Sequence, residues 1–109
     1  MSDRIELRGL RVVAICGVLP EEKTRRQPFE VDLDVHADLS TASVSDDLAD
    51  TVDYGGLTGL VAGIADGESF DLLERFAGRI AEATQGIDGV DAVRSEEHTS
   101  ELQSRVDLV

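Results

Sequence analysis

A strictly alternating stretch, FEVDLDVHADL at residues 29–39, restricts the possible folds more than any other part of the sequence. Its odd-numbered positions are all apolar, and its even-numbered positions are acidic apart from one histidine. Because successive side chains of a strand point to opposite faces of the sheet, this pattern predicts a strand with one apolar and one acidic face. Such strands are typical of antiparallel sheets with one face against a core and the other in water.

The stretch RIELRGLRVVAIC at residues 4–16 predicts a second strand, whose alternation changes phase. Its apolar positions are odd-numbered before Gly9 and even-numbered from there to residue 14. A glycine at such a slip indicates a β-bulge. The connection to the alternating strand, residues 17–28, contains Pro, Gly and charged residues and is too long for a tight hairpin turn.

Two helical patterns follow, and a further strand comes after them. Asp53 is the expected N-cap of the first helix, whose apolar face consists of Tyr54, Leu57, Leu60, Val61 and Ile64. Ser69 is the expected cap of the second, which ends near Gly86 and has the apolar stripe Phe70, Leu73, Ala77, Ile80 and Ala81. DGVDAV, residues 88–93, then begins a third strand. This order predicts an α+β fold, an antiparallel sheet with two helices packed on one face.

The composition narrows the classes of partner. A chain of 109 residues suits one domain. Its formal net charge of −13 argues against binding to nucleic acids or anionic membranes. No apolar run approaches the length of a membrane span. The single cysteine, Cys16, cannot form an internal disulfide, which fits a reducing, cytoplasmic location.

Three residues are candidates for a functional site. Glu74 falls within the apolar stripe of the second helix, so it is either an edge residue that reaches water, a partner for an arginine such as Arg79, or a carboxylate that binds the N–H groups of a ligand. Tyr54, the only tyrosine, is either an anchor at a helix start or a phenol placed for proton transfer. Glu22, in GVLPEE, is ordinarily a solvated charge.

Other chemistries lack the necessary residues. His36 and His98 are far apart, and no His/Cys spacing resembles a metal site. Cys16 has no histidine nearby and is expected to be a small buried hydrophobe. No glycine-rich loop between a strand and a helix indicates a nucleotide site.

Five segments, in this order, resemble the dihydroneopterin aldolases of folate biosynthesis: DRIELRGLRV, GVLPEE, QPFEVDLDV, SDDLADTVDYG and FDLLERFAGRIAE. The resemblance extends in register from residue 3 to about residue 93. It implies the tunnelling fold, in which the sheets of a homotetramer close a β-barrel and tetramers often stack into octamers. It also implies retro-aldol cleavage of dihydroneopterin to 6-hydroxymethyl-dihydropterin and glycolaldehyde, with no metal, Schiff base or other cofactor.

The resemblance assigns roles to matching residues. Glu74, helped by the backbone of Leu73, would bind the amino-pyrimidine edge of the pterin. Glu22 would bind ordered water and the substrate side chain. Tyr54, contributed by the neighbouring subunit, would contact the substrate and take part in proton transfer.

Two departures from the family pattern stand out. Cys16 occupies a position where many relatives have histidine, and the lysine that serves as general base in the closing segment is absent, since Lys23 is the only lysine. The chain as written is therefore expected to be inactive or feeble. A dihydroneopterin triphosphate epimerase and a non-catalytic pterin-binding or oligomerising module are the alternatives.

The end of the chain, residues 94–109, interrupts the third strand with serines and glutamates. Codons can be chosen for residues 94–104 that reproduce the common adapter oligonucleotide of short-read DNA sequencing. The hypothesis is an incomplete dihydroneopterin aldolase-like domain at 1–93 and a non-native tail at 94–109; the alternative is a natural polar helix capped by Ser95. On the first view the closing strands are missing, and the tail is expected to leave the body as a short helix or loose segment.

Overall fold

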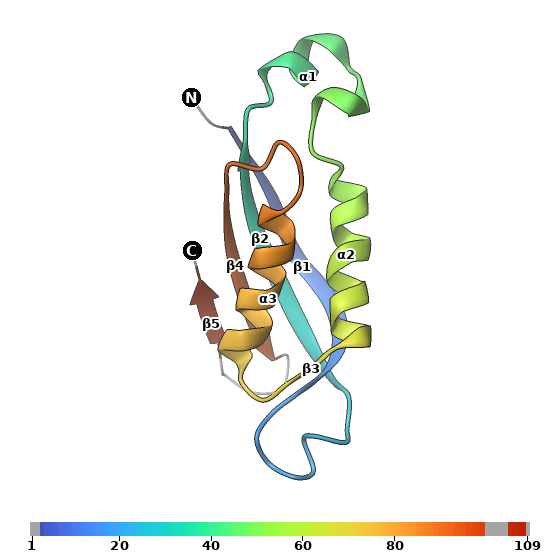
Figure 1. Cartoon of the computed structure of the whole chain (residues 1–109), viewed down its shortest axis with the longest axis vertical. Coiled ribbons are helices and arrows are strands. Elements are labelled where there is room, and N and C mark those ends of the chain that lie inside the picture. The colour runs from blue at the N-terminus through green and yellow to red at the C-terminus, as the bar shows by residue number, and fades with distance from the viewer. Residues whose placement is uncertain (1–2, 100–104, 109) are drawn as a thin grey trace.

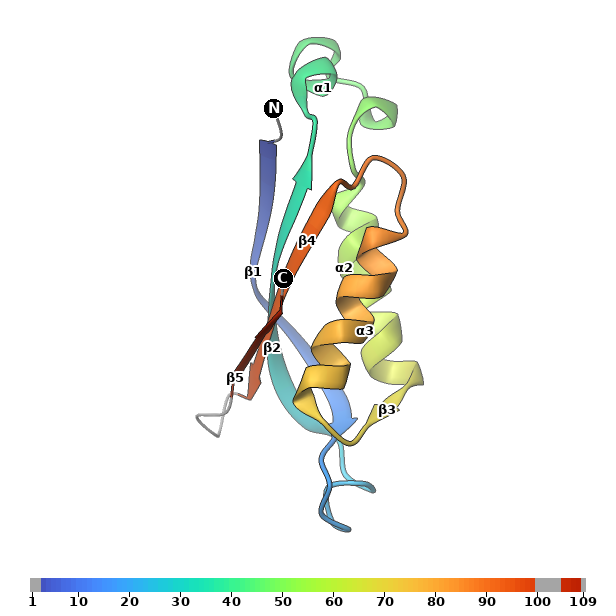
Figure 2. The ribbon, with the colours of Figure 1, turned by 60° about the vertical axis from the view of Figure 1, so that its left-hand side comes forward.

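The computed structural model describes residues 3–99 and 105–108. Its elements are β1 (Asp3–Cys16), β2 (Gln27–Ala37), α1 (Ser40–Ser45), the 3-10 helix η1 (Leu48–Asp50), α2 (Tyr54–Gly67), β3 (Ser69–Phe70), α3 (Leu73–Gln85), β4 (Ala92–Thr99) and β5 (Arg105–Leu108). The strands form one sheet in the order β3-β1-β2-β4-β5. All pairs are antiparallel except β1 with β3. The long helices α2 and α3 cover one face of this sheet (Figures 1 and 2), so the predicted α+β architecture is confirmed.

The predicted bulge lies in β1. The register with β2 shifts between Leu7 and Leu10, and Gly9 between them has a φ of 67°. This left-handed conformation is cheap only for glycine. The Gly9 N–H donates to Asp32 Oδ1 at 2.7 Å, so an acidic side chain of β2 satisfies a group that the ladder leaves unpaired.

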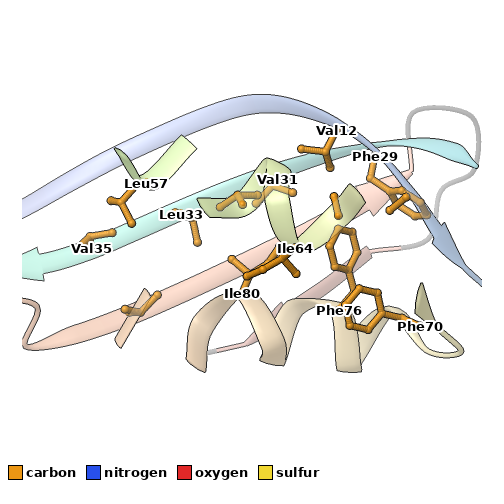
Figure 3. Packing of buried hydrophobic residues seen from close by; sticks show 14 of the residues in the cluster. Val12, Phe29, Val31, Leu33, Val35, Leu57, Ile64, Phe70, Phe76 and Ile80 are labelled. Carbon is orange, nitrogen blue, oxygen red and sulfur yellow. The ribbon is translucent and has the colours of Figure 1, made fainter. Parts of the chain in front are cut away.

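The core lies between the sheet and the two long helices (Figure 3). The apolar residues of β2 alternate inward as the sequence predicts, with Val31 and Val35 fully buried. Phe76 of α3 packs edge-on against Phe29, with ring centroids 5.6 Å apart, and stacks on Phe70 at 5.0 Å. These rings fill the end of the core nearest β3, where the sheet, the loop after β1 and the start of α3 meet.

The outward face of β2 contains one buried carboxylate, Asp34, which is 5% exposed. Arg8 lies 2.5 Å from it across the bulge and Arg94 of β4 lies 3.5 Å away. Burial pushes the pKa of the Asp34 carboxyl upward, but the hydrogen bond and positive charge of Arg8 outweigh it and hold the pKa below its ordinary value. The ionised form is therefore favoured by folding.

Asp34→Asn is expected to remove part of the acid dependence of stability. A carboxyl with a depressed folded pKa stabilises the fold above its unfolded pKa of about 4, and this contribution disappears as pH falls through the folded value. At neutral pH the variant should lose about 1–3 kcal/mol of unfolding free energy, because the arginines lose their carboxylate. Urea unfolding between pH 2 and 7 measures both effects. Asp88→Asn, on the exposed loop before β4, is the control, and an unchanged acid slope in Asp34→Asn would contradict the assignment.

The starts of the two helices differ in how well the sequence predicts them. Asp53 caps α2 as expected, its carboxylate accepting from the Gly56 N–H at 2.9 Å. The prediction that Ser69 caps the second helix is wrong. Ser69 and Phe70 instead pair in parallel with Ile15 and Cys16, and α3 begins at Leu73, with Leu72 at the N-cap. This short pairing provides backbone hydrogen bonds for the segment before α3, and the Phe70 side chain is buried.

The expectation that the tail leaves the body, with the closing strands missing, is also wrong for the described residues. Residues 94–99 continue β4 along β2, and residues 105–108 form β5 beside β4. Residues 100–104 and 109 lie outside the described part of the chain. Backbone hydrogen bonds between strands need no particular side chains, and an open edge of β2 pairs with any extended segment that reaches it.

The side chains of β4 nevertheless change character at the proposed boundary. Opposite the apolar residues Val35, Leu33 and Val31 of β2, the inward positions of β4 are Val93, Ser95 and Glu97. All three are buried, and Glu97 is fully so. The Ser95 hydroxyl donates to Glu97 Oε1. An apolar core face thus becomes polar directly after residue 93.

Candidate active site

Glu22, in the loop after β1, folds back against the end of that strand, near β3. The Gly17 N–H donates to the Phe70 carbonyl at 2.9 Å, which joins the end of β1 to β3. A Cβ on Gly17 would lie 2.5 Å from the Cβ of Glu22, so only glycine leaves room for this side chain. Glu22 Oε1 also accepts from the Leu19 N–H at 3.1 Å. Glu22 is therefore a positioned carboxylate and not a freely solvated one.

Glu74 lies in the first turn of α3. It is exposed at the edge of the helix, although the sequence placed it within the apolar stripe. A carboxylate is favoured there because the first N–H groups of a helix give that end a partial positive charge. Arg79, the alternative partner, binds Glu68 at 3.0 Å instead. Within residues 3–99 and 105–108 no cation pairs with Glu74, which leaves its carboxylate available to a ligand.

Cys16, at the end of β1, lies within the electrostatic influence of three acidic side chains. Burial raises the pKa of its thiol to about 11, and the negative charges of Glu22, Glu74 and Asp71 raise it further in that order of size. All three carboxylates therefore lie near enough to the end of β1 to act on this thiol. The Cys16 side chain is buried, as predicted for a small hydrophobe, and its raised pKa favours the neutral thiol at physiological pH.

Tyr54 lies at the opposite end of the helical layer. It is the first residue of α2 and is 55% exposed, and it borders a hollow of about 400 Å³ lined by Leu39, Ala42, Ser43, Asp46, Asp47, Leu48 and Thr51. The helices α2 and α3 run in opposite directions (Figure 2), and the fourteen residues of α2 extend about 21 Å. A single chain thus brings together Glu22, Leu73 and Glu74 but leaves Tyr54 far from them.

Two residues to which the sequence assigned no role in the site also belong to this region. Asp71 precedes α3, and its carboxylate binds the ammonium group of Lys23 at 2.7 Å. Both are exposed charges in connecting segments, where composition gives no signal. Only the pairing of β1 with β3 brings the two segments together.

Residues 3–99 and 105–108 contain no group of three His, Cys, Asp or Glu side chains that could hold a metal ion. In the same part of the chain, every helix is too short or too polar to cross a bilayer.

Comparison with known proteins gives the family. The sequence model of the dihydroneopterin aldolase family, FolB, matches residues 5–106. The chain belongs to the dihydroneopterin aldolase family. The function predicted from the sequence, that of a folate-pathway aldolase, is confirmed at the level of the family.

Individual relatives agree with this. Dihydroneopterin aldolase 2 of Arabidopsis thaliana is 42% identical over 87 residues, which are 80% of this chain and 66% of that protein. The dihydroneopterin aldolase of Streptomyces coelicolor is 40% identical over 91 residues, 84% of this chain and 76% of that protein. The matched part of the chain thus spans about two thirds of the length of the plant relative and about three quarters of the bacterial one.

Solved structures of dihydroneopterin aldolases share the fold. A putative enzyme from Vibrio cholerae superposes with a TM-score of 0.88 at 26% identity, covering 97% of this chain and 94% of that one. The Escherichia coli enzyme in complex with neopterin also gives 0.88, at 24% identity, covering 98% and 99%. The chain therefore shares the fold of these proteins over nearly all of its length.

Proposed function

We propose that this chain binds 7,8-dihydroneopterin through Glu74 and belongs to an enzyme that cleaves it to 6-hydroxymethyl-7,8-dihydropterin and glycolaldehyde. The observation that carries the proposal is the exposed carboxylate of Glu74, which pairs with no cation among the described residues and lies at the same end of the sheet as the positioned Glu22. The family gives the reaction, and the E. coli structure with neopterin shows that a member of the fold binds a pterin.

Glu74 provides the recognition. Two adjacent N–H groups on the amino-pyrimidine edge of a pterin match the two oxygens of one carboxylate, and such paired, charge-assisted bonds are strong and directional. Leu73, half-buried at the start of α3, adds backbone polar groups at the same place. Glu22, held by the Leu19 N–H, faces the substrate side chain through ordered water.

Tyr54 comes from a neighbouring subunit. The molecule measures 51 × 21 × 21 Å, and both of its ends expose apolar side chains: Val44, Leu48 and Tyr54 at one end, and Val18, Leu19 and Leu72 at the other. A head-to-tail contact in a closed homo-oligomer brings the Tyr54 end of one copy to the Glu74 end of the next. Assembly as a tetramer or octamer is part of this proposal, as the resemblance to the family implies.

The reaction needs a base and an electron acceptor. A base removes the proton of the 2′-hydroxyl, the C1′–C2′ bond breaks to release glycolaldehyde, and the electron pair enters the C=N bond of the dihydropterin ring. A proton then returns to C1′, with Tyr54 taking part in the transfer. The ring takes the place of a metal ion or Schiff base. The family's lysine base has no counterpart here, because Lys23 is the only lysine and is paired with Asp71, so turnover by the chain as written is expected to be feeble.

The charge around the site favours an unphosphorylated substrate. Glu22, Asp71 and Glu74 all lie near the end of β1, and Lys23 is already paired with Asp71. A triphosphate would meet net repulsion there, which argues against the epimerase alternative. A buried thiol that stays reduced fits the cytoplasm.

We further propose that residues 94–109 are not native to the domain formed by residues 1–93. The support is the change on the inward face of β4, which is apolar at Val93 and polar at Ser95 and Glu97. A selected strand over this core would continue with apolar residues. Genomic sequence beyond codon 93 tests this directly, since an identical natural sequence there would overturn it.

Mixing of subunits tests the shared site. Tyr54→Phe and Glu74→Ala are made in a chain whose residues 94–109 are replaced by the C-terminal segment of the Streptomyces coelicolor enzyme. Each variant alone should have little activity, and random mixed oligomers should regain about a quarter of the parent activity, because one site in four receives both intact residues. Glycolaldehyde release is the measurement, with each variant remixed with itself as the control. No recovery despite proven subunit exchange would count against a shared site, and neopterin binding without any product would favour the non-catalytic alternative.

A further inference from the structure

The loop between β1 and β2, residues 17–26, is fixed at both of its ends. At the first, the Gly17 N–H binds the Phe70 carbonyl at 2.9 Å. At the second, the guanidinium of Arg26 donates to the Asp66 carbonyl at 2.8 Å, at the C-terminal end of α2. Figure 1 shows the loop extending beyond the sheet below β3, so its middle depends on contacts of its own.

The middle of the loop is one turn that contains both Glu22 and Lys23. The Leu19 carbonyl accepts from the N–H of Glu22 at 2.9 Å and from that of Lys23 at 3.2 Å. The Leu19 N–H returns a bond to Glu22 Oε1. Because the two residues share this turn, a force on the Lys23 side chain moves Glu22 as well.

One ion pair connects this turn to the helical layer. Lys23 Nζ lies 2.7 Å from Asp71 Oδ1, and among the hydrogen bonds and ion pairs of the described residues no other side-chain contact joins residues 18–25 to the helices or to β3. Asp71 stands between β3 and α3, three residues before Glu74. The pair therefore joins the turn that carries Glu22 to the segment that begins the helix of Glu74.

We propose that Lys23 and Asp71 are positioning residues that hold Glu22 at its working distance from Glu74 for the pterin. This inference rests on the proposed function. Both side chains are about half or more exposed, at 48% and 68%, and exposed ion pairs contribute little to global stability. The pair acts on the fraction of time that the loop occupies its binding position, and the apparent dissociation constant rises as that fraction falls.

The test compares four changes in the chain as written: Lys23→Gln, Asp71→Asn, both together, and the exchange Lys23→Asp with Asp71→Lys. Each single change should weaken neopterin binding about 3–10-fold, the double change should be no worse than either single one, and the exchange should restore most of the affinity. The free energy of unfolding should stay constant throughout. The control is Arg75→Gln, which breaks the similarly exposed Arg75–Glu82 pair of α3, at 2.9 Å, and should leave binding unchanged.

A second measurement needs no ligand. Trypsin cleaves after Arg25 within the loop, and Asp71→Asn keeps every cleavage site, so release of the loop should speed this cut several-fold. Unchanged binding and unchanged cleavage in Asp71→Asn would overturn the inference, as would an equal loss of affinity in Arg75→Gln. If the unaltered chain bound no neopterin while Asp71→Asn still accelerated cleavage, the proposed function would fail and the loop contact would stand.

Discussion

Glu74→Gln is expected to weaken neopterin binding by about 30–150-fold while leaving the free energy of unfolding within about 0.5 kcal/mol of the parent value. A carboxylate accepts two N–H groups of a pterin edge at once, whereas an amide presents one acceptor and one donor. The donor then faces a ligand N–H, so the loss is about 2–3 kcal/mol. The fold should not respond, because Glu74 is exposed and has no cationic partner in the described part of the chain.

Glu82→Gln is the matched control. Glu82 is an exposed glutamate two turns further along α3, and its partner Arg75 faces solvent as well. The same chemical change there should leave neopterin affinity unaltered. Titration calorimetry and urea unfolding on both variants separate recognition from stability. Equal affinity in Glu74→Gln and the parent would remove Glu74 from the site.

The features of the sheet that depend on residues close together in the sequence were predictable. The alternation of residues 29–39 identifies the inward side chains of β2, and Gly9 marks the bulge, because both depend only on neighbours in the chain. Which outward acid of β2 becomes buried was not predictable. Asp34 is the buried one because it pairs with Arg8 across the bulge and with Arg94 on the other neighbouring strand. These contacts exist only after the strands pair.

The start of α3 shows how a distant contact overrides a local signal. A serine before an apolar periodic run is a common helix cap, yet Ser69 pairs with Ile15, more than fifty residues earlier. The helix therefore begins at Leu73, later than predicted. Glu74 lies in its exposed first turn and not within an apolar stripe. This shift accounts for the difference between the predicted and observed surroundings of Glu74.

The candidate site was predictable in part. The resemblance to the family identified Glu22, Leu73 and Glu74, which the structure brings to one end of the sheet. The contribution of Asp71 and Lys23 depends on the parallel contact of β1 with β3, which no periodicity reveals. Tyr54 lies at the opposite end of the helical layer, so its proposed role depends on an assembly that one chain does not contain.

Residues 94–99 show that pairing and packing are separate requirements. Their backbone completes a ladder along β2, while their inward side chains place Ser95 and Glu97 where the rest of the core is apolar. A buried carboxylate loses its hydration, which costs free energy that an apolar residue of suitable size does not incur. Glu97→Val is therefore expected to raise the free energy of unfolding by about 1–4 kcal/mol, and Ser95→Val should add to it.

The control is Glu6→Val, which makes the same substitution on an outward position of β1 with 43% of its side chain exposed. It gains the strand preference of valine without removing a buried charge, so its effect should stay within about 0.5 kcal/mol. Exchange of residues 94–109 for the Streptomyces coelicolor segment should go further. It should restore apolar packing on β4 and, by returning the family's lysine, retro-aldol activity as well. If Glu97→Val destabilised the chain, or if the chain as written turned over dihydroneopterin as fast as the exchanged one, the tail would have to be native to the domain.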